Sequence, residues 1–117
     1  MGRMNFKALR LSDLSTPRQR LVRLCQTTNY GHIQRLDVKD SEPIFASEPL
    51  VSVEVKLDVD EVARREVELV DFALPDEMCR LMARLDEIQN GVIERIEVRA
   101  GVPRRIVFRL RALEVPR

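Results

Sequence analysis

Two nine-residue stretches decide the fold that we expect: Gly31-His32-Ile33-Gln34-Arg35-Leu36-Asp37-Val38-Lys39 and Gly91-Val92-Ile93-Glu94-Arg95-Ile96-Glu97-Val98-Arg99. Apolar and polar residues alternate along both stretches, which is typical of β-strands with one buried face. The alternation places Leu36 and Val38 on the apolar face of the first strand and Ile96 and Val98 on that of the second. Asp40-Ser41 and Ala100-Gly101 follow directly, so each strand is expected to open a β-hairpin.

The two stretches belong to a longer internal similarity at an offset of 60 residues. Eight of the 30 positions from 14 to 43 are identical to their counterparts, where composition alone would give roughly two. The identical positions are Leu14, Arg20, Leu21, Gly31, Ile33, Arg35, Val38 and Pro43. We interpret this as a duplicated helix-plus-hairpin unit. The alternative is that two unrelated units share the Gly and Pro residues that punctuate such motifs.

A helix is expected before each hairpin. In the first copy Ser15 is a capping residue, Pro17 suits the first turn, and Leu21, Leu24, Cys25 and Thr28 recur at helical spacing. In the second copy Asp76 and Glu77 lie where the helix dipole favours negative charge. The expected buried stripe there consists of Met78, Leu81, Met82, Leu85 and Ile88.

The remaining segments are expected to complete one sheet. The return strand of the second copy alternates, with Ile106, Phe108 and Leu110 inward and Val107, Arg109 and Arg111 outward. Residues 50–59 alternate valine or leucine with polar residues and predict a long half-buried strand. Residues 60–73 form an acidic connector. We expect a short edge strand at residues 66–70 of this connector, and the alternative is a helical turn.

These expectations define an α+β fold in one domain over residues 1–117. The element order is α-β-β-β-α-β-β, a two-layer sandwich in which two helices cover an antiparallel sheet. Pseudo-repeat 1 comprises residues 14–43 with the strand 50–59, and pseudo-repeat 2 comprises residues 74–111.

Composition limits the classes of function. The chain has 117 residues, 44% hydrophobic and 33% charged, which is typical of a globular domain. One histidine and two cysteines cannot build a two-histidine zinc site or a four-cysteine cluster in one chain, so no metal or cofactor is expected. The N-terminus lacks the apolar run of a signal peptide, and no stretch approaches the roughly 18 apolar residues of a membrane span. A cytoplasmic protein with reduced thiols and no membrane contact is therefore expected.

Charge is unevenly distributed behind a net charge of +1. Residues 40–77 carry twelve acidic and three basic residues, whereas residues 78–117 carry nine basic and five acidic ones. Intramolecular pairing between the acidic middle and the basic ends is one explanation. The other is an interaction surface of opposite potentials, suited to self-association or to a charged partner.

A basic sheet face is the candidate binding site. The expected second hairpin directs five arginines to one face: Arg95, Arg99, Arg105, Arg109 and Arg111. Guanidinium groups bind phosphate or carboxylate in a bidentate manner. Nucleic-acid binding on this face would depend on phosphate contacts and on salt, because aromatic residues that could stack on bases are few.

No catalytic constellation is evident. His32 has Val92 as its counterpart and no second histidine, Cys25 and Cys79 lie on or beside apolar helix stripes, and the carboxylates near Asp58 lack the spacing of a calcium loop. We therefore expect a small non-enzymatic protein-interaction or structural module that binds a protein partner or itself. The alternative is a nucleic-acid-associated domain that contacts phosphates through the arginine face, and a third class is an enzyme that uses His32 or Cys79.

Overall fold

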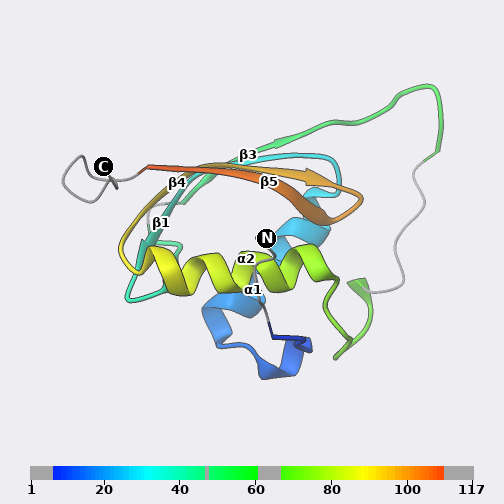
Figure 1. Ribbon diagram of the computed structural model, residues 1–117. Helices are drawn as coiled ribbons and strands as arrows, with labels where there is room; N and C mark the ends of the chain where they lie inside the picture. The colour runs from blue at the N-terminus through cyan, green and yellow to red at the C-terminus, as the bar shows by residue number, and fades with distance from the viewer. Residues whose placement is uncertain (1–6, 47, 61–66, 110–117) are drawn as a thin grey trace, which may run out of the picture.

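The protein is a two-layer α+β sandwich. A computed structural model describes residues 7–46, 48–60 and 67–109. Both helices lie against one face of a five-stranded antiparallel sheet, and the other face is open (Figure 1). The elements are α1 (Thr16–Thr28), β1 (Gly31–Lys39), β2 (Glu42–Ile44), β3 (Leu50–Val53), α2 (Asp76–Ile88), β4 (Gly91–Arg99) and β5 (Val102–Arg109). The expected class and order are confirmed, and a short 3-10 turn, η1 (Leu11–Asp13), precedes α1.

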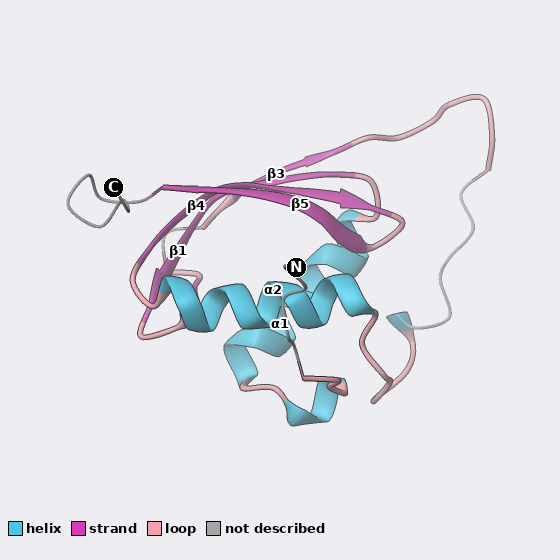
Figure 2. Cartoon of the chain, in the orientation of Figure 1, coloured by secondary structure: helices cyan, strands magenta, loops and turns pink. Residues whose placement is uncertain are grey.

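The helices begin as the sequence indicates (Figure 2). The Ser15 hydroxyl accepts a hydrogen bond from the backbone N–H of Arg18, which satisfies one free donor of the first turn of α1. Asp76 and Glu77 occupy the first turn of α2. The buried side chains of both helices and of the central strands form one hydrophobic cluster, so the core lies between the two layers.

The two long strands β1 and β4 pair in the centre of the sheet. The strand order is β2-β1-β4-β5, and β3 pairs with the part of β1 that β2 leaves uncovered. Gly31 lies opposite Val98, and Val38 lies opposite Gly91. Because Gly91 and Val98 are 60 residues beyond Gly31 and Val38, this register is unchanged when the two halves are exchanged. The halves are thus related by an approximate twofold axis; the duplication of a gene segment remains a prediction.

Each hairpin turn closes the helix end of the opposite half. Asn29 and Gln89, both with positive φ, follow the last residues of α1 and α2. The N–H of Ser41 donates to the carbonyl of Gln89 at 2.8 Å, and the N–H of Gly101 donates to the carbonyl of Asn29 at 2.9 Å. These reciprocal bonds tie the two halves together at both ends of the central strand pair.

The faces of the two central strands differ from the expected strict alternation. Ile33 and Ile93, assigned to the outer faces, are fully buried together with Leu36, Val38, Ile96 and Val98. In β1 the cause is Arg35, whose φ of 62° makes a local bulge, so two residues rather than one separate Ile33 from Leu36. The pairing of β4 with β5 shifts register at the equivalent place, between Ile93 and Arg95.

The return strand β5 follows the prediction. Ile106 and Phe108 pack on the core, whereas Val107 and Arg109 are exposed. Leu110 and Arg111 lie outside the described residues.

The predicted half-buried strand over residues 50–59 is wrong beyond Val53. β3 contains Leu50–Val53, and its side chains are exposed, as are those of the following residues up to Asp60. The reason is the position of the neighbouring strand. β1 begins at Gly31, which lies opposite Val53, so no strand is available to pair with the chain beyond this point.

The acidic connector packs against the N-terminal segment instead of adding an edge strand. Residues 67–70 form no strand, and Glu66 of the predicted strand lies outside the described residues. The N–H of Leu11 donates to the carbonyl of Phe72 at 3.0 Å, and the N–H of Leu74 donates to the carbonyl of Leu9 at 2.9 Å. The guanidinium of Arg23 lies 5.3 Å from the centre of the Phe72 ring.

Candidate functional site

The open face of the sheet is built from three rows of side chains. Residues directly opposite each other in adjacent strands project from the same face of a sheet. Since Ile33, Ile93 and Ile96 face the helices, the registers define the rows on the other side. From β3 or β2 to β5 these rows are Ser52–His32–Glu97–Arg105, Leu50–Gln34–Arg95–Val107 and Ile44–Asp37–Val92–Arg109.

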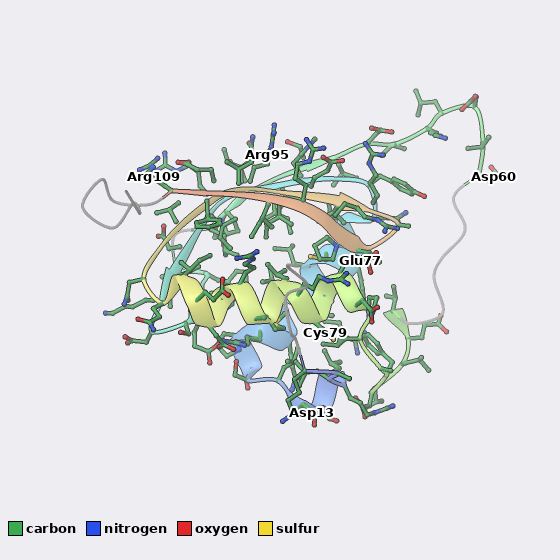
Figure 3. The ribbon with its side chains drawn as sticks, in the orientation of Figure 1. Asp13, Asp60, Glu77, Cys79, Arg95 and Arg109 are labelled. Atoms are coloured by element: carbon green, nitrogen blue, oxygen red, sulfur yellow. The ribbon has the colours of Figure 1, made fainter. Side chains whose placement is uncertain are left out.

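The structure places the expected arginines on this face, as far as it describes them. Arg95, Arg105 and Arg109 stand in the three rows, and Arg99 lies opposite Val102 near the turn. Arg95 and Arg109 project away from the helices (Figure 3). Arg111 lies outside the described residues.

Not all of these arginines are equally available. Arg109 forms an ion pair with Glu94, and the Nε of Arg99 lies 2.9 Å from a carboxylate oxygen of Glu97. Within the described part of the chain, Arg95 and Arg105 form no ion pair. The free positive charge is therefore concentrated toward the middle of the face.

A further arginine, Arg35, lies at this site and was not among the five expected arginines. Arg35 and Arg95 both line a shallow depression of about 380 Å³ at the middle of the open face. The other lining residues are Gln34, Leu50, Glu94 and Val107. Arg35 is exposed and forms no ion pair with any described residue. Its match with Arg95 at the 60-residue offset and its place in the alternation were the available signals, but the expected site was drawn from the second hairpin alone.

The depression combines charge with apolar surface. Leu50 is 63% exposed and Val107 is 44% exposed, on either side of the two arginines. Glu94, Glu97 and Asp37 also belong to the open face and offset part of its positive charge. The depression therefore presents two guanidinium groups without ion pairs to described residues beside apolar side chains, and the face as a whole is not uniformly basic.

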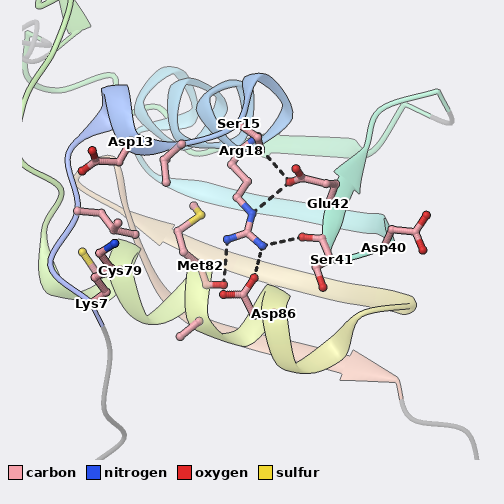
Figure 4. A pocket seen from close by; sticks show the side chains of 13 residues that line it. Lys7, Asp13, Ser15, Arg18, Asp40, Ser41, Glu42, Cys79, Met82 and Asp86 are labelled. Carbon is pink, nitrogen blue, oxygen red and sulfur yellow. Dashed lines mark hydrogen bonds and ion pairs between the residues drawn. The ribbon is translucent and has the colours of Figure 1, made fainter.

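A second hollow, of about 350 Å³, lies between α1, α2 and the turn after β1 (Figure 4). Arg18 occupies it with a side chain that is 13% exposed. Its guanidinium donates to Glu42 at 3.1 Å, to the carbonyl of Ser41 at 2.9 Å and to Asp86 at 2.5 Å. Because its donors are used within the protein, this arginine joins the two halves and is a poor anchor for a ligand.

The charge segregation has a partly intramolecular explanation. Glu42, Asp71 and Glu77 of the acidic middle pair with Arg18, Arg10 and Arg104 of the basic ends, respectively. By contrast, Glu54, Asp58 and Asp60 form no ion pair with described residues and lie along the exposed chain after β3.

The residues considered for chemistry are dispersed. Cys25 and Cys79 are buried free thiols, and burial raises the pKa of Cys25 to about 12, which opposes formation of the reactive thiolate. His32 lies on the open face next to Glu97. Asp58 and Asp60 are exposed, and Glu61 lies outside the described residues.

Comparisons of the chain with protein-family models, curated protein sequences and solved structures found no match. No helix within the described ranges is long and apolar enough to cross a membrane.

Proposed function

We propose that this protein is a non-enzymatic interaction module that binds an acidic segment of a partner protein on the open face of its sheet. One observation carries the proposal. Arg35 and Arg95 are free of ion pairs with described residues, and they share a depression with the exposed side chains of Leu50 and Val107. Guanidinium groups bind carboxylates through charge-assisted hydrogen bonds, and adjacent apolar surface adds affinity when it is buried.

A protein partner suits this face better than nucleic acid. Two of the arginines that would contact phosphates already form ion pairs within the protein: Arg109 with Glu94, and Arg99 with Glu97. The three rows contain no Phe, Tyr or Trp on which bases could stack. Nucleic-acid binding therefore remains the second candidate, supported by Arg35, Arg95 and Arg105 alone.

Fluorescence polarisation with defined probes tests the proposal. The probes are a labelled peptide of alternating Glu and Leu, a single-stranded oligonucleotide and a duplex, at salt concentrations of about 50 and 200 mM. We expect the peptide to bind, and the double variant Arg35→Ala/Arg95→Ala to bind it about a hundredfold more weakly, since each charge-assisted hydrogen bond contributes about 1.5 kcal/mol or more.

Arg84→Ala is the matched control. Arg84 is an exposed arginine on α2 that pairs with Glu87, away from the open face. This variant should bind the peptide as the wild type does. Equal binding by the double variant, or binding of the oligonucleotides alone with a steep loss at the higher salt concentration, would contradict the proposal.

A further inference from the structure

Residues 50–60 form an exposed segment, which we call the edge arm; it is a strand over Leu50–Val53 and bends at residues 57–59. It starts as β3 and then continues past the beginning of β1, away from the two layers (Figure 1). Five apolar side chains alternate along it, and their exposed fractions are unusually high for valine and leucine. They are Val51 at 40%, Val53 at 52%, Val55 at 53%, Leu57 at 95% and Val59 at 57%. A long apolar edge of this kind favours pairing with another strand.

The backbone of the edge arm has one free side. The N–H of Glu54 donates to the carbonyl of Tyr30 at 2.7 Å, so the polar backbone groups of Glu54 point toward β1. These groups alternate between the two sides of a strand from one residue to the next. Those of Val51, Val53 and Val55 therefore point to the opposite side, where the described residues provide no strand.

The sequence of the edge arm is self-complementary about Val55. In an antiparallel pair of two such arms centred on this residue, Val51 lies opposite Val59 and Val53 lies opposite Leu57. On the other face Glu54 lies opposite Lys56, and the same pair forms a second time by symmetry. The register thus places apolar residues against apolar ones and opposite charges against each other.

The register also agrees with the direction of the backbone groups. The residues that would exchange hydrogen bonds in this register are the odd-numbered ones, from Val51 to Val59. The polar groups of Val51, Val53 and Val55 already face the free side, and pairing would straighten the bend at residues 57–59 so that Leu57 and Val59 continue the pattern. Pairing over this length would form about ten inter-chain hydrogen bonds.

We propose that the protein forms a symmetric dimer in which the edge arms of two copies pair antiparallel about Val55. The sheets of the two copies then become continuous, and one interface closes the assembly, as in most homodimers. The free edge of β5, where Arg104 is exposed, is a competing site for an acidic strand. Arm-to-β5 pairing would join two different surfaces and would not place Glu54 opposite Lys56. The dimer is independent of the binding proposed for the open face.

A charge exchange tests both the dimer and its register. Sedimentation equilibrium of the full chain should show a monomer–dimer equilibrium. Glu54→Lys and Lys56→Glu should each weaken it about tenfold or more, because each creates two like-charge pairs. The double variant Glu54→Lys/Lys56→Glu should dimerise as the wild type does, and an equimolar mixture of the two single variants should form a heterodimer.

Symmetric cross-linking gives a second readout. Under mild oxidation Val55→Cys should form a disulfide-linked dimer, because the two substituted positions face each other across the axis. Leu57→Cys is the control: its two copies would be four residues apart along the strands, about 13 Å, which is beyond the reach of a disulfide. The native Cys25 and Cys79 are buried and should not contribute.

A monomer at every concentration would overturn the proposal, as would equal cross-linking of Val55→Cys and Leu57→Cys. Loss of dimer in Glu54→Lys without recovery in the double variant would overturn the register and indicate pairing with β5. All substituted side chains are exposed, so far-UV circular dichroism should be unchanged in each variant.

Discussion

The two halves of the molecule share their inner strands and differ in the strands that flank them. β1 and β4 are equal in length and have the same sequence of buried and exposed positions. Outside β4, β5 runs from Val102 to Arg109 as one strand. Outside β1, the equivalent edge is covered in two pieces, β2 and β3, with residues 45–49 between them. Burial thus imposes the same geometry on the inner strands, whereas the edge tolerates an inserted loop and a protruding arm.

The glycines that begin the two inner strands should show the largest difference between the halves. A Cβ at Gly31 would lie 1.8 Å from the backbone oxygen of Ser52 in β3, whereas a Cβ at Gly91 would approach no atom nearer than 3.4 Å. Gly31→Ala should therefore lower the free energy of unfolding by about 3 kcal/mol, and Gly91→Ala by less than about 1 kcal/mol. Urea denaturation measures both. Equal losses of unfolding free energy in the two variants would show that the backbone of β3 moves away to make room for a Cβ at residue 31.

Arg18 provides the next contrast, because the equivalent position in the second half is the buried Met78. Arg18→Met would leave Glu42 and Asp86 without their partner and should cost about 1–2 kcal/mol of stability. The exposed pair of Arg84 with Glu87 is the control, and Arg84→Met should change stability by less than about 0.5 kcal/mol. Thermal and urea denaturation at neutral pH would report the difference. If Arg18→Met leaves the free energy of unfolding unchanged, packing alone joins the two halves at this place.

Arg35 and Arg95 should respond to glycine with opposite signs. Arg35 has a φ of 62°, a conformation that costs less for glycine, whereas Arg95 has no positive φ. Arg35→Gly should be neutral or stabilising by up to about 1 kcal/mol. Arg95→Gly should be destabilising by about 0.5–1 kcal/mol, because glycine loses more backbone freedom on folding. Denaturant midpoints of the two variants, measured side by side, would test whether only the first half carries the strained bulge.

The smallest effect should come from Asp71, which attaches the connector to the first half. The hydrogen bond from the Arg10 side chain, together with that from the Ser12 N–H, lowers the pKa of Asp71 from 3.8 to about 2. The carboxylate therefore contributes stability above about pH 4, and this contribution is lost as the pH falls through about 2. Wild type and Asp71→Asn should differ most near neutral pH and converge near pH 2. A constant difference across this range would contradict the assignment.

The sequence predicted the parts of the fold that depend on local signals. Ser15 and the two hairpin turns mark element boundaries, and helical spacing identified the buried stripe of α2. Arg95, Arg105 and Arg109 lie on one face of the sheet as expected, and the regular alternation of β5 was the signal for Arg109; their role in binding stays a prediction.

Other features depend on residues distant in the chain and were not predictable in the same way. The alternation in residues 50–59 indicates a strand, but it does not show whether a neighbouring strand extends far enough to cover it. Nothing in the residue type of Arg35 signals a positive φ, so the bulge and its effect on the face of Ile33 were missed. The cluster around Arg18 joins three segments that are close only after folding.

The exchange of hydrogen bonds between Ser41 and Gln89 and between Gly101 and Asn29 bears on how the chain folds. The carbonyls of Asn29 and Gln89, which follow the two helices, accept these bonds only when the halves have docked. We therefore expect that neither half folds on its own. The amide protons of Ser41 and Gly101, although they belong to surface turns, should exchange with solvent deuterium only through opening of the whole domain. Separately produced fragments, cut within the connector, should be largely unstructured alone and regain the native spectrum on mixing.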